Sequence, residues 1–258
     1  MDKAGHTFNK VAQVNVFFWI MKICATTLGE TGGDLLSMTM NIGYAISSLV
    51  LLSFFLVTLF IQLAAKKYHP VIYWLVIVST STAGTTISDY MDRTLELGYF
   101  KGSLILVCCL LAILGVWRYT EGSLSVNYIR RKRTEIFYWT AILFSNTLGT
   151  ALGDFLADSS GLGFFGGAIL IGSLLALVLL AYYFTSISRV LLFWIAFVLT
   201  RPFGATFGDV LTKPAERGGL NLGTIGSSAV LAAILVSFII YTSIKHKDVA
   251  TSAEAERA

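Results

Sequence analysis

Residues 139–154 read WTAILFSNTLGTALGD, and this arrangement occurs in three further segments of the chain. Residues 19–34 read WIMKICATTLGETGGD, residues 74–89 read WLVIVSTSTAGTTISD, and residues 194–209 read WIAFVLTRPFGATFGD. Each segment begins with a tryptophan, a glycine follows this tryptophan by ten residues, and an aspartate follows it by fifteen. Three residue types at one fixed spacing indicate an internal repeat rather than chance.

The same positions recur in every copy. The tryptophans are Trp19, Trp74, Trp139 and Trp194. The glycines are Gly29, Gly84, Gly149 and Gly204, and the aspartates are Asp34, Asp89, Asp154 and Asp209. A second glycine follows the aspartate by nine residues at Gly43, Gly98 and Gly163. We expect its fourth counterpart at Gly223, delayed by an insertion of five residues.

The overall composition is that of a membrane protein. Of 258 residues, 55% are hydrophobic and 13% are charged, whereas a soluble domain carries about 25% charged residues. This balance excludes a disulfide-stapled secreted module, a disordered chain and an ordinary cytosolic enzyme. The apolar runs are continuous rather than alternating, so they predict helices and not a β-barrel.

Eight apolar runs approach the length of about 20 residues that a helix needs to cross a bilayer. They cover residues 11–31, 42–64, 71–89, 102–117, 136–154, 163–185, 190–209 and 222–244. We therefore predict an all-α polytopic membrane protein with eight transmembrane helices. Because each repeat holds two of them, the four repeats enter the membrane in the same direction, as four parallel two-helix units.

The chain is expected to form a single membrane domain over residues 1–258. Its repeats cover approximately residues 11–66, 67–118, 134–187 and 188–246. Residues 119–133 are expected to form a basic cytoplasmic linker, and residues 247–258 a polar, disordered tail. The repeats can close into a ring or form two halves of two repeats each, and the sequence permits both.

The basic residues indicate the orientation of the chain. Most of the 19 lysines and arginines lie near the N-terminus, in the even-to-odd loops or in the C-terminal tail, including the run at residues 130–133. Positive loops stay on the cytoplasmic side, so both termini are expected there. The net charge of +4 therefore does not indicate nucleic-acid binding.

The tryptophan-anchored repeats resemble a bacterial membrane-protein family that consists of four tandem copies of a repeat of unknown function. Each copy in that family has two transmembrane segments and a characteristic tryptophan. The resemblance covers roughly residues 11–244 and includes all four tryptophans. It implies a multi-pass protein of the bacterial inner membrane and implies no activity.

Each odd-numbered helix carries a polar stripe that ends in its aspartate, because residues four apart share one helix face. The stripes are Thr26, Glu30 and Asp34; Ser81, Thr85 and Asp89; Asn146, Thr150 and Asp154; and Arg201, Ala205 and Asp209. A row of small residues runs beside each stripe. These rows are Gly29 and Gly33, Gly84 and Ser88, Gly149 and Gly153, and Gly204 and Gly208. Small residues allow membrane helices to approach closely, so we expect the rows to pack together and the stripes to line a central polar cavity.

The stripe predicts an ion-binding site. Carboxylate, hydroxyl and amide oxygens suit hard cations, so Glu30 and the four aspartates are the candidate metal ligands, and the remaining polar stripe residues complete the candidate site. We expect a secondary transporter or exchanger of a small ion, a cation being favoured. The alternatives are an anion or small-metabolite carrier that uses Arg201, and a structural or accessory subunit without transport.

Purely structural roles for the same residues are also possible interpretations. The aspartates can be solvated helix ends or can cap the following helices. Arg201 can form a structural ion pair with Glu30 or an aspartate, and Lys22 can extend toward the cytoplasmic face. The four tryptophans suit anchoring at the membrane interface.

The sequence contains no motif for several common functions. The cysteines have no metal-ligand spacing, and no nucleotide-binding loop or nucleophile–base pair is visible, so neither an enzyme nor a cofactor is expected. The expected partners are a small ion and the lipid bilayer. Further copies of the chain are an open alternative, and nucleic acid is not expected.

Overall fold

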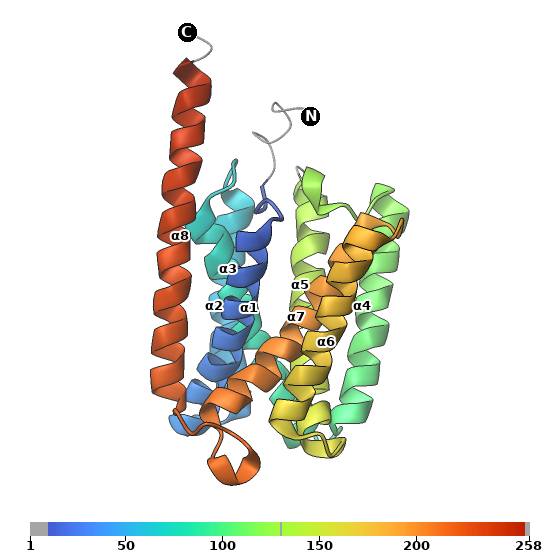
Figure 1. Ribbon diagram of the computed structural model, residues 1–258, viewed down its shortest axis with the longest axis vertical. Helices are drawn as coiled ribbons and strands as arrows, with labels where there is room; N and C mark the ends of the chain where they lie inside the picture. The colour runs from blue at the N-terminus through green and yellow to red at the C-terminus, as the bar shows by residue number, and fades with distance from the viewer. Residues whose placement is uncertain (1–9, 130, 256–258) are drawn as a thin grey trace.

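The computed structural model describes residues 10–129 and 131–255, and over these residues the chain is helical with no strand. Figure 1 shows the helices side by side, with short turns at one end of the bundle. The eight α-helices are α1 (Val16–Asp34), α2 (Tyr44–Ala64), α3 (Pro70–Asp89), α4 (Tyr99–Glu121), α5 (Lys132–Asp154), α6 (Gly163–Phe184), α7 (Arg189–Thr212) and α8 (Thr224–Ala255).

The turns after the odd helices repeat as the helices do. In the first three repeats the helix runs from its aspartate directly into a π-turn, and these turns are η2 (Leu35–Thr39), η3 (Tyr90–Thr94) and η5 (Phe155–Ser159). The even helix then begins beside a glycine of positive φ, at Gly43 (82°), Gly98 (72°), Gly163 (67°) and Gly223 (76°). Glycine adopts this conformation without a steric penalty. The expected register is therefore confirmed, including the delayed position in the fourth repeat.

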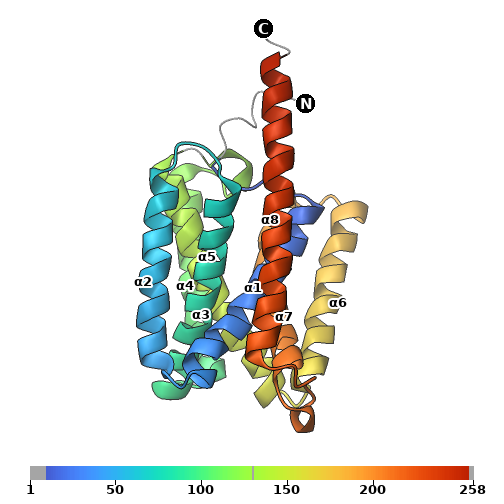
Figure 2. The same ribbon diagram turned by 90° about the vertical axis from the view of Figure 1, so that its left-hand side faces the viewer.

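The odd helices form a closed inner ring. α1 packs against α3, α3 against α5, α5 against α7, and α7 against α1. Each even helix covers the ring from outside and packs mainly on the odd helix of the next repeat, so α2 lies on α3, α4 on α5 and α6 on α7. α8 closes the circle by packing on α1, in front of which it lies in Figure 2. Each repeat thus completes its neighbour rather than folding on itself.

The outer helices present apolar side chains to the surroundings. Only 17% of the apolar window of α2 is buried inside the protein, whereas 72% of the corresponding window of α3 is buried. By length and composition six helices can cross a membrane, namely α2, α3, α4, α6, α7 and α8. α1 and α5 do not qualify, because polar residues lower their mean hydropathy: Lys22 and Glu30 lie within α1, and α5 contains Ser145, Asn146 and several threonines.

Two expected boundaries are wrong. α4 continues to Glu121 and α5 begins at Lys132, so the linker between them covers residues 122–131 rather than 119–133. The backbone of α8 continues to Ala255, whereas we expected a disordered tail over residues 247–258. Backbone hydrogen bonding does not require apolar side chains, so a helix can extend past its apolar run. Residues 256–258 lie outside the described part of the chain.

Candidate functional site

The small-residue rows pack against the polar stripes of the neighbouring repeat. At each ring contact a Cβ added to the glycine would lie between 2.1 and 3.1 Å from the nearest atom of the facing residue. The first-level pairs are Gly29 with Ser81, Gly84 with Asn146, Gly149 with Arg201 and Gly204 with Thr26. One turn further, the pairs are Gly33 with Thr85, Gly153 with Ala205 and Gly208 with Glu30. The predicted close approach of the odd helices is confirmed.

The expectation that the stripes line an open cavity is wrong for this structure. The stripe side chains turn inward, but they pack against one another and are buried. The long Arg201 side chain enters the middle of the ring, where the other helices have short polar residues. The pockets of about 370 and 610 Å³ lie elsewhere, one beside Gly223 and one between α4 and the start of α7.

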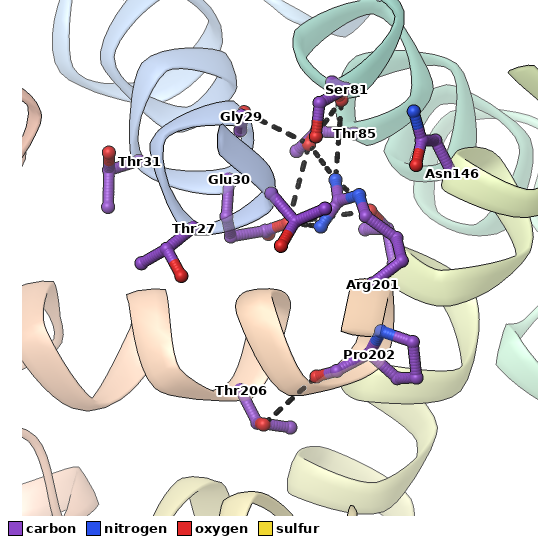
Figure 3. Close-up of polar contacts among 12 residues, drawn as sticks. Thr27, Gly29, Glu30, Thr31, Ser81, Thr85, Asn146, Arg201, Pro202 and Thr206 are labelled. Atoms are coloured by element: carbon purple, nitrogen blue, oxygen red, sulfur yellow. Dashed lines mark hydrogen bonds and ion pairs between the residues drawn. The ribbon is translucent and has the colours of Figure 1, made fainter. Parts of the chain in front are cut away.

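Arg201 joins all four odd helices at the centre of the ring, as Figure 3 shows. Its Nη1 donates to Glu30 Oε2 at 3.0 Å. Its Nη2 donates to the Ser81 carbonyl at 3.3 Å and to Thr150 Oγ1 at 2.7 Å, and it also bonds Thr85 Oγ1. The interpretation of Arg201 as an ion-pair partner of Glu30 is confirmed. Arg201 is fully buried, so the pair depends on these hydrogen bonds to offset the loss of hydration.

Toward the chain termini, the ring interior continues with Lys22. This side chain is fully buried, its Nζ donates to Asn146 Oδ1 at 3.3 Å, and it lies 4.1 Å from the centre of the Phe197 ring. The expectation that Lys22 extends to the membrane surface is therefore wrong. Asn146 donates to Thr80 Oγ1 at 2.8 Å, and Thr26 donates to the Thr200 carbonyl at 3.1 Å.

At the opposite end, the four aspartates form two pairs, and each pair is bridged by one basic residue. Arg93 contacts Asp89 through Nε and Asp154 through Nη2, both at 3.0 Å. Lys213 Nζ lies 2.6 Å from Asp34 Oδ2 and 3.2 Å from Asp209 Oδ1. All four aspartates are buried. Nothing indicates a capping role for Asp34, Asp89 or Asp154, whose side chains make no cap hydrogen bond to the turns that follow.

The two bridging residues were not among the predicted site residues. Arg93 and Lys213 are charges of the odd-to-even loops when they are counted by topology alone. The available signal was their position: each follows its aspartate by four residues, in the second and fourth repeats. Residues four apart lie on one helix face, so the basic group reaches its own aspartate and the next one around the ring.

Only part of the predicted metal-ligand set comes together. Ligand atoms of Glu30, Asp34 and Asp209 all lie within 4.8 Å of one another. Asp89 and Asp154 are held on the other side by Arg93. The fourfold sequence pattern therefore produces two bridged aspartate pairs that are not equivalent, since only α1 has a carboxylate one turn before its aspartate.

Three of the four tryptophans do not lie at the surface, where membrane anchoring was expected, and Trp19 is partly buried. Trp74, Trp139 and Trp194 are buried, and they belong to an aromatic layer near the start of the odd helices. In each repeat an aromatic residue precedes the tryptophan and helps to form this layer. The observed contacts between neighbouring repeats are Phe18 with Trp74 (5.8 Å), Tyr73 with Trp139 (5.5 Å) and Phe193 with Trp19 (5.7 Å) between ring centres. The layer closes this end of the polar interior.

A segment before α1 lies across the same end. Lys10 donates from Nζ to Glu135, and its carbonyl accepts a hydrogen bond from Gln62 Nε2 at 3.1 Å. Gln62 also donates to Glu135 Oε1 at 3.0 Å. Lys10, Gln62 and Glu135 are buried, so Lys10 has a structural role that its position near the N-terminus did not suggest.

Fold and site together define the class: a helical membrane protein in which four tandem repeats enclose a buried, charged interior. The chain belongs to the family described as Repeat of Unknown Function (DUF347), which matches residues 17–68, 72–123, 137–188 and 192–247. The four matches contain the four helix pairs and confirm the expected family. No curated protein and no solved structure matches the chain.

Proposed function

We propose that this protein is a secondary transporter or exchanger of a small cation, either a proton or a divalent metal ion, and that the cation passes through the interior of the ring. The charge balance of the ring carries the proposal. Its carboxylates are Glu30, Asp34, Asp89, Asp154 and Asp209. Its basic groups are Lys22, Arg93, Arg201 and Lys213. The acidic groups outnumber the basic groups by one, and a bound cation or proton would balance the difference.

The energetic cost of placing charged side chains inside the ring favours a transport role over simple packing of the helices. Ionisable side chains within membrane helices are expensive and commonly mark ion pathways. Four helices could pack through their small residues with serine or threonine in the stripes, as parts of α3 and α5 do. The retention of five carboxylates along one interior therefore favours a chemical role.

We also propose that all eight helices cross the bacterial inner membrane, with both termini in the cytoplasm. α1 and α5 are less apolar than the other helices, but both belong to the inner ring. A helix enclosed by other helices does not need an apolar face on every side. The distribution of basic residues supports the orientation.

A structural or accessory subunit is the second candidate. The tight packing of Gly149 and Gly204 against neighbouring side chains favours it, because these contacts leave little room between the helices. An anion carrier has less support. Both terminal nitrogens of Arg201 already donate to groups within the ring.

The test is ion flux in proteoliposomes that contain the purified full chain. Gradients of protons, Mn²⁺ or Na⁺ are applied, and flux is compared with empty vesicles. We expect flux for at least one ion, and we expect Asp34→Asn combined with Asp209→Asn to lower it by about tenfold or more, which corresponds to about 1.4 kcal/mol. The exposed loop variant Glu96→Gln is the matched control. Absence of flux from wild-type vesicles for all three ions would contradict the proposal and favour the structural subunit.

A further inference from the structure

The cluster at the end of α1 and α7 already holds a cation, and that cation belongs to the chain. Lys213 Nζ lies between Asp34 Oδ2 at 2.6 Å and Asp209 Oδ1 at 3.2 Å. Glu30 completes a group of three buried carboxylates whose ligand atoms lie within 4.8 Å of one another. The ammonium therefore contacts two of the three carboxylates that a small hard cation would use.

Lys213 remains charged in this position. The Asp34 and Asp209 carboxylates, at 2.6 and 3.2 Å from its Nζ, stabilise the ammonium form by direct charge attraction. Lys213 thus acts as a fixed positive charge rather than as a base. A second cation can use Asp34 and Asp209 fully only when this ammonium moves away, because like charges repel at such distances.

The position of Lys213 at the end of α7 allows its side chain to move away from the two carboxylates. Lys213 is the residue at which α7 ends, its backbone is extended (φ −74°, ψ 156°), and Pro214 follows. The loop over residues 213–223 contains the insertion that the other repeats lack. This loop is held to α7 by backbone hydrogen bonds from Leu220 to the Val210 carbonyl (2.6 Å) and from Leu222 to the Leu211 carbonyl (2.9 Å). The ammonium therefore leaves by rotation of its own flexible side chain, which is 19% exposed at the outer end of the ring. By contrast, Arg93 lies inside the π-turn η3, which continues directly from α3.

The two bridged pairs also differ in charge. Glu30 lies one turn before Asp34, whereas Thr85 and Thr150 occupy the same level before Asp89 and Asp154. Arg93 therefore faces two carboxylates, and Lys213 faces two with a third beside them. Removal of the lysine charge exposes the more acidic of the two pairs.

We propose that Lys213 is a tethered counter-ion that a transported cation displaces from Asp34 and Asp209, and that Lys213 thereby sets the affinity of this site. The inference rests on the proposed function, because it concerns the same cluster. It assigns the substrate class as a small hard cation that binds carboxylate oxygens.

The experiment measures equilibrium binding of Mn²⁺ and of Na⁺ to the purified full chain in detergent, at one fixed pH. Lys213→Met removes the charge and keeps a side chain of similar length. We expect this variant to bind at least one of the two ions about tenfold more tightly than the wild type, within the usual range of coupling between two sites. The gain should disappear when Asp34→Asn is added.

Two variants serve as comparisons. Lys101→Met removes an exposed lysine of α4 and should leave binding unchanged. Arg93→Met should gain less than Lys213→Met, because the third carboxylate is missing there. Lys213→Gln provides a second test if Lys213→Met does not elute as a folded protein.

A folded Lys213 variant with wild-type affinity for both ions would overturn the inference. So would an equal gain in Lys101→Met. Binding at equilibrium does not require transport, so these results are independent of the flux assay. If the wild type shows flux but the Lys213 variants show no change in ion affinity, only the inference is contradicted. If the Lys213 variants bind an ion more tightly but the wild type shows no flux, only the proposed transport is contradicted.

Discussion

At the scale of single residues, the ion pair between Arg201 and Glu30 is the centre of the molecule. It joins α7 to α1, and Nη2 of Arg201 reaches α3 and α5. A buried pair is costly to desolvate, and the loss of one partner leaves an uncompensated charge. The pair is therefore more important for the arrangement of the helices than for net stability.

A double-mutant cycle tests this role of the pair. Arg201→Met and Glu30→Gln should each lower the free energy of unfolding by about 3–5 kcal/mol, because each leaves a buried charge without its partner. The double variant should be less destabilised than the sum of the two single variants. Unfolding of the purified protein in detergent, followed by circular dichroism, measures all three. Additive effects would show that the two side chains do not depend on each other.

The sequence predicted the stripe residues and offered the pair of Arg201 with Glu30, but it did not predict how the aspartates pair. The repeat pattern identified Glu30 and Arg201 as the exceptions to fourfold symmetry, and these two residues do contact each other. Arg93 and Lys213 were missed, because charges near a helix end look like loop charges until the helix boundary is known. Their contacts with Asp154 and Asp34 join residues 61 and 179 positions apart, so these contacts depend on how the helices are arranged in space, and no local spacing encodes that.

At the scale of helices, the glycine rows decide how closely the ring can pack. Gly149 faces the base of the Arg201 side chain, and a Cβ at this position would overlap Arg201 Cγ and Cβ. Gly115 in α4 provides a contrast, since a Cβ there would meet no atom within 4 Å. Both glycines lie in the interior of long helices, but only at Gly149 do the neighbouring side chains leave no room for a Cβ atom.

We expect Gly149→Ala to destabilise the protein by about 1–3 kcal/mol, because the added methyl group must displace Arg201 from its contacts. Gly115→Ala should instead stabilise by about 0.5–1 kcal/mol, because alanine favours a helix interior. Thermal unfolding in detergent compares the two variants directly. Equal effects of the two substitutions would mean that the ring does not depend on the close approach at Gly149.

At the scale of the whole molecule, both ends of the ring are closed. The aromatic layer and the segment around Lys10 cover one end, and the bridged aspartate pairs lie at the other. The described structure is thus an occluded arrangement, in which a cation on either side meets a layer of side chains before it reaches Glu30. The transport that we propose would require these layers to open in turn.

Cysteine labelling of intact cells tests the orientation that we propose. In a variant whose native cysteines are replaced by serine, a membrane-impermeant reagent should label Lys101→Cys and Ser160→Cys from outside. Ser125→Cys and Ser186→Cys should be labelled only after the cells are opened, because the basic residues keep those loops in the cytoplasm. Labelling of Ser186→Cys but not Lys101→Cys in intact cells would reverse the orientation.

The sequence alone shows the low charge content, the fourfold repeat and the regular spacing of the glycines. Composition and spacing are properties of the chain itself and do not depend on tertiary contacts. They predicted a helical membrane protein of four two-helix repeats and its inward-facing polar stripes. Only the tertiary structure decided that each even helix covers the next repeat, that Trp74 and Trp139 are buried, and that Lys213 lies between Asp34 and Asp209. These features arise from contacts between distant segments. Packing chooses among the faces that a helix offers, and the sequence of one helix cannot specify which neighbour will meet each face.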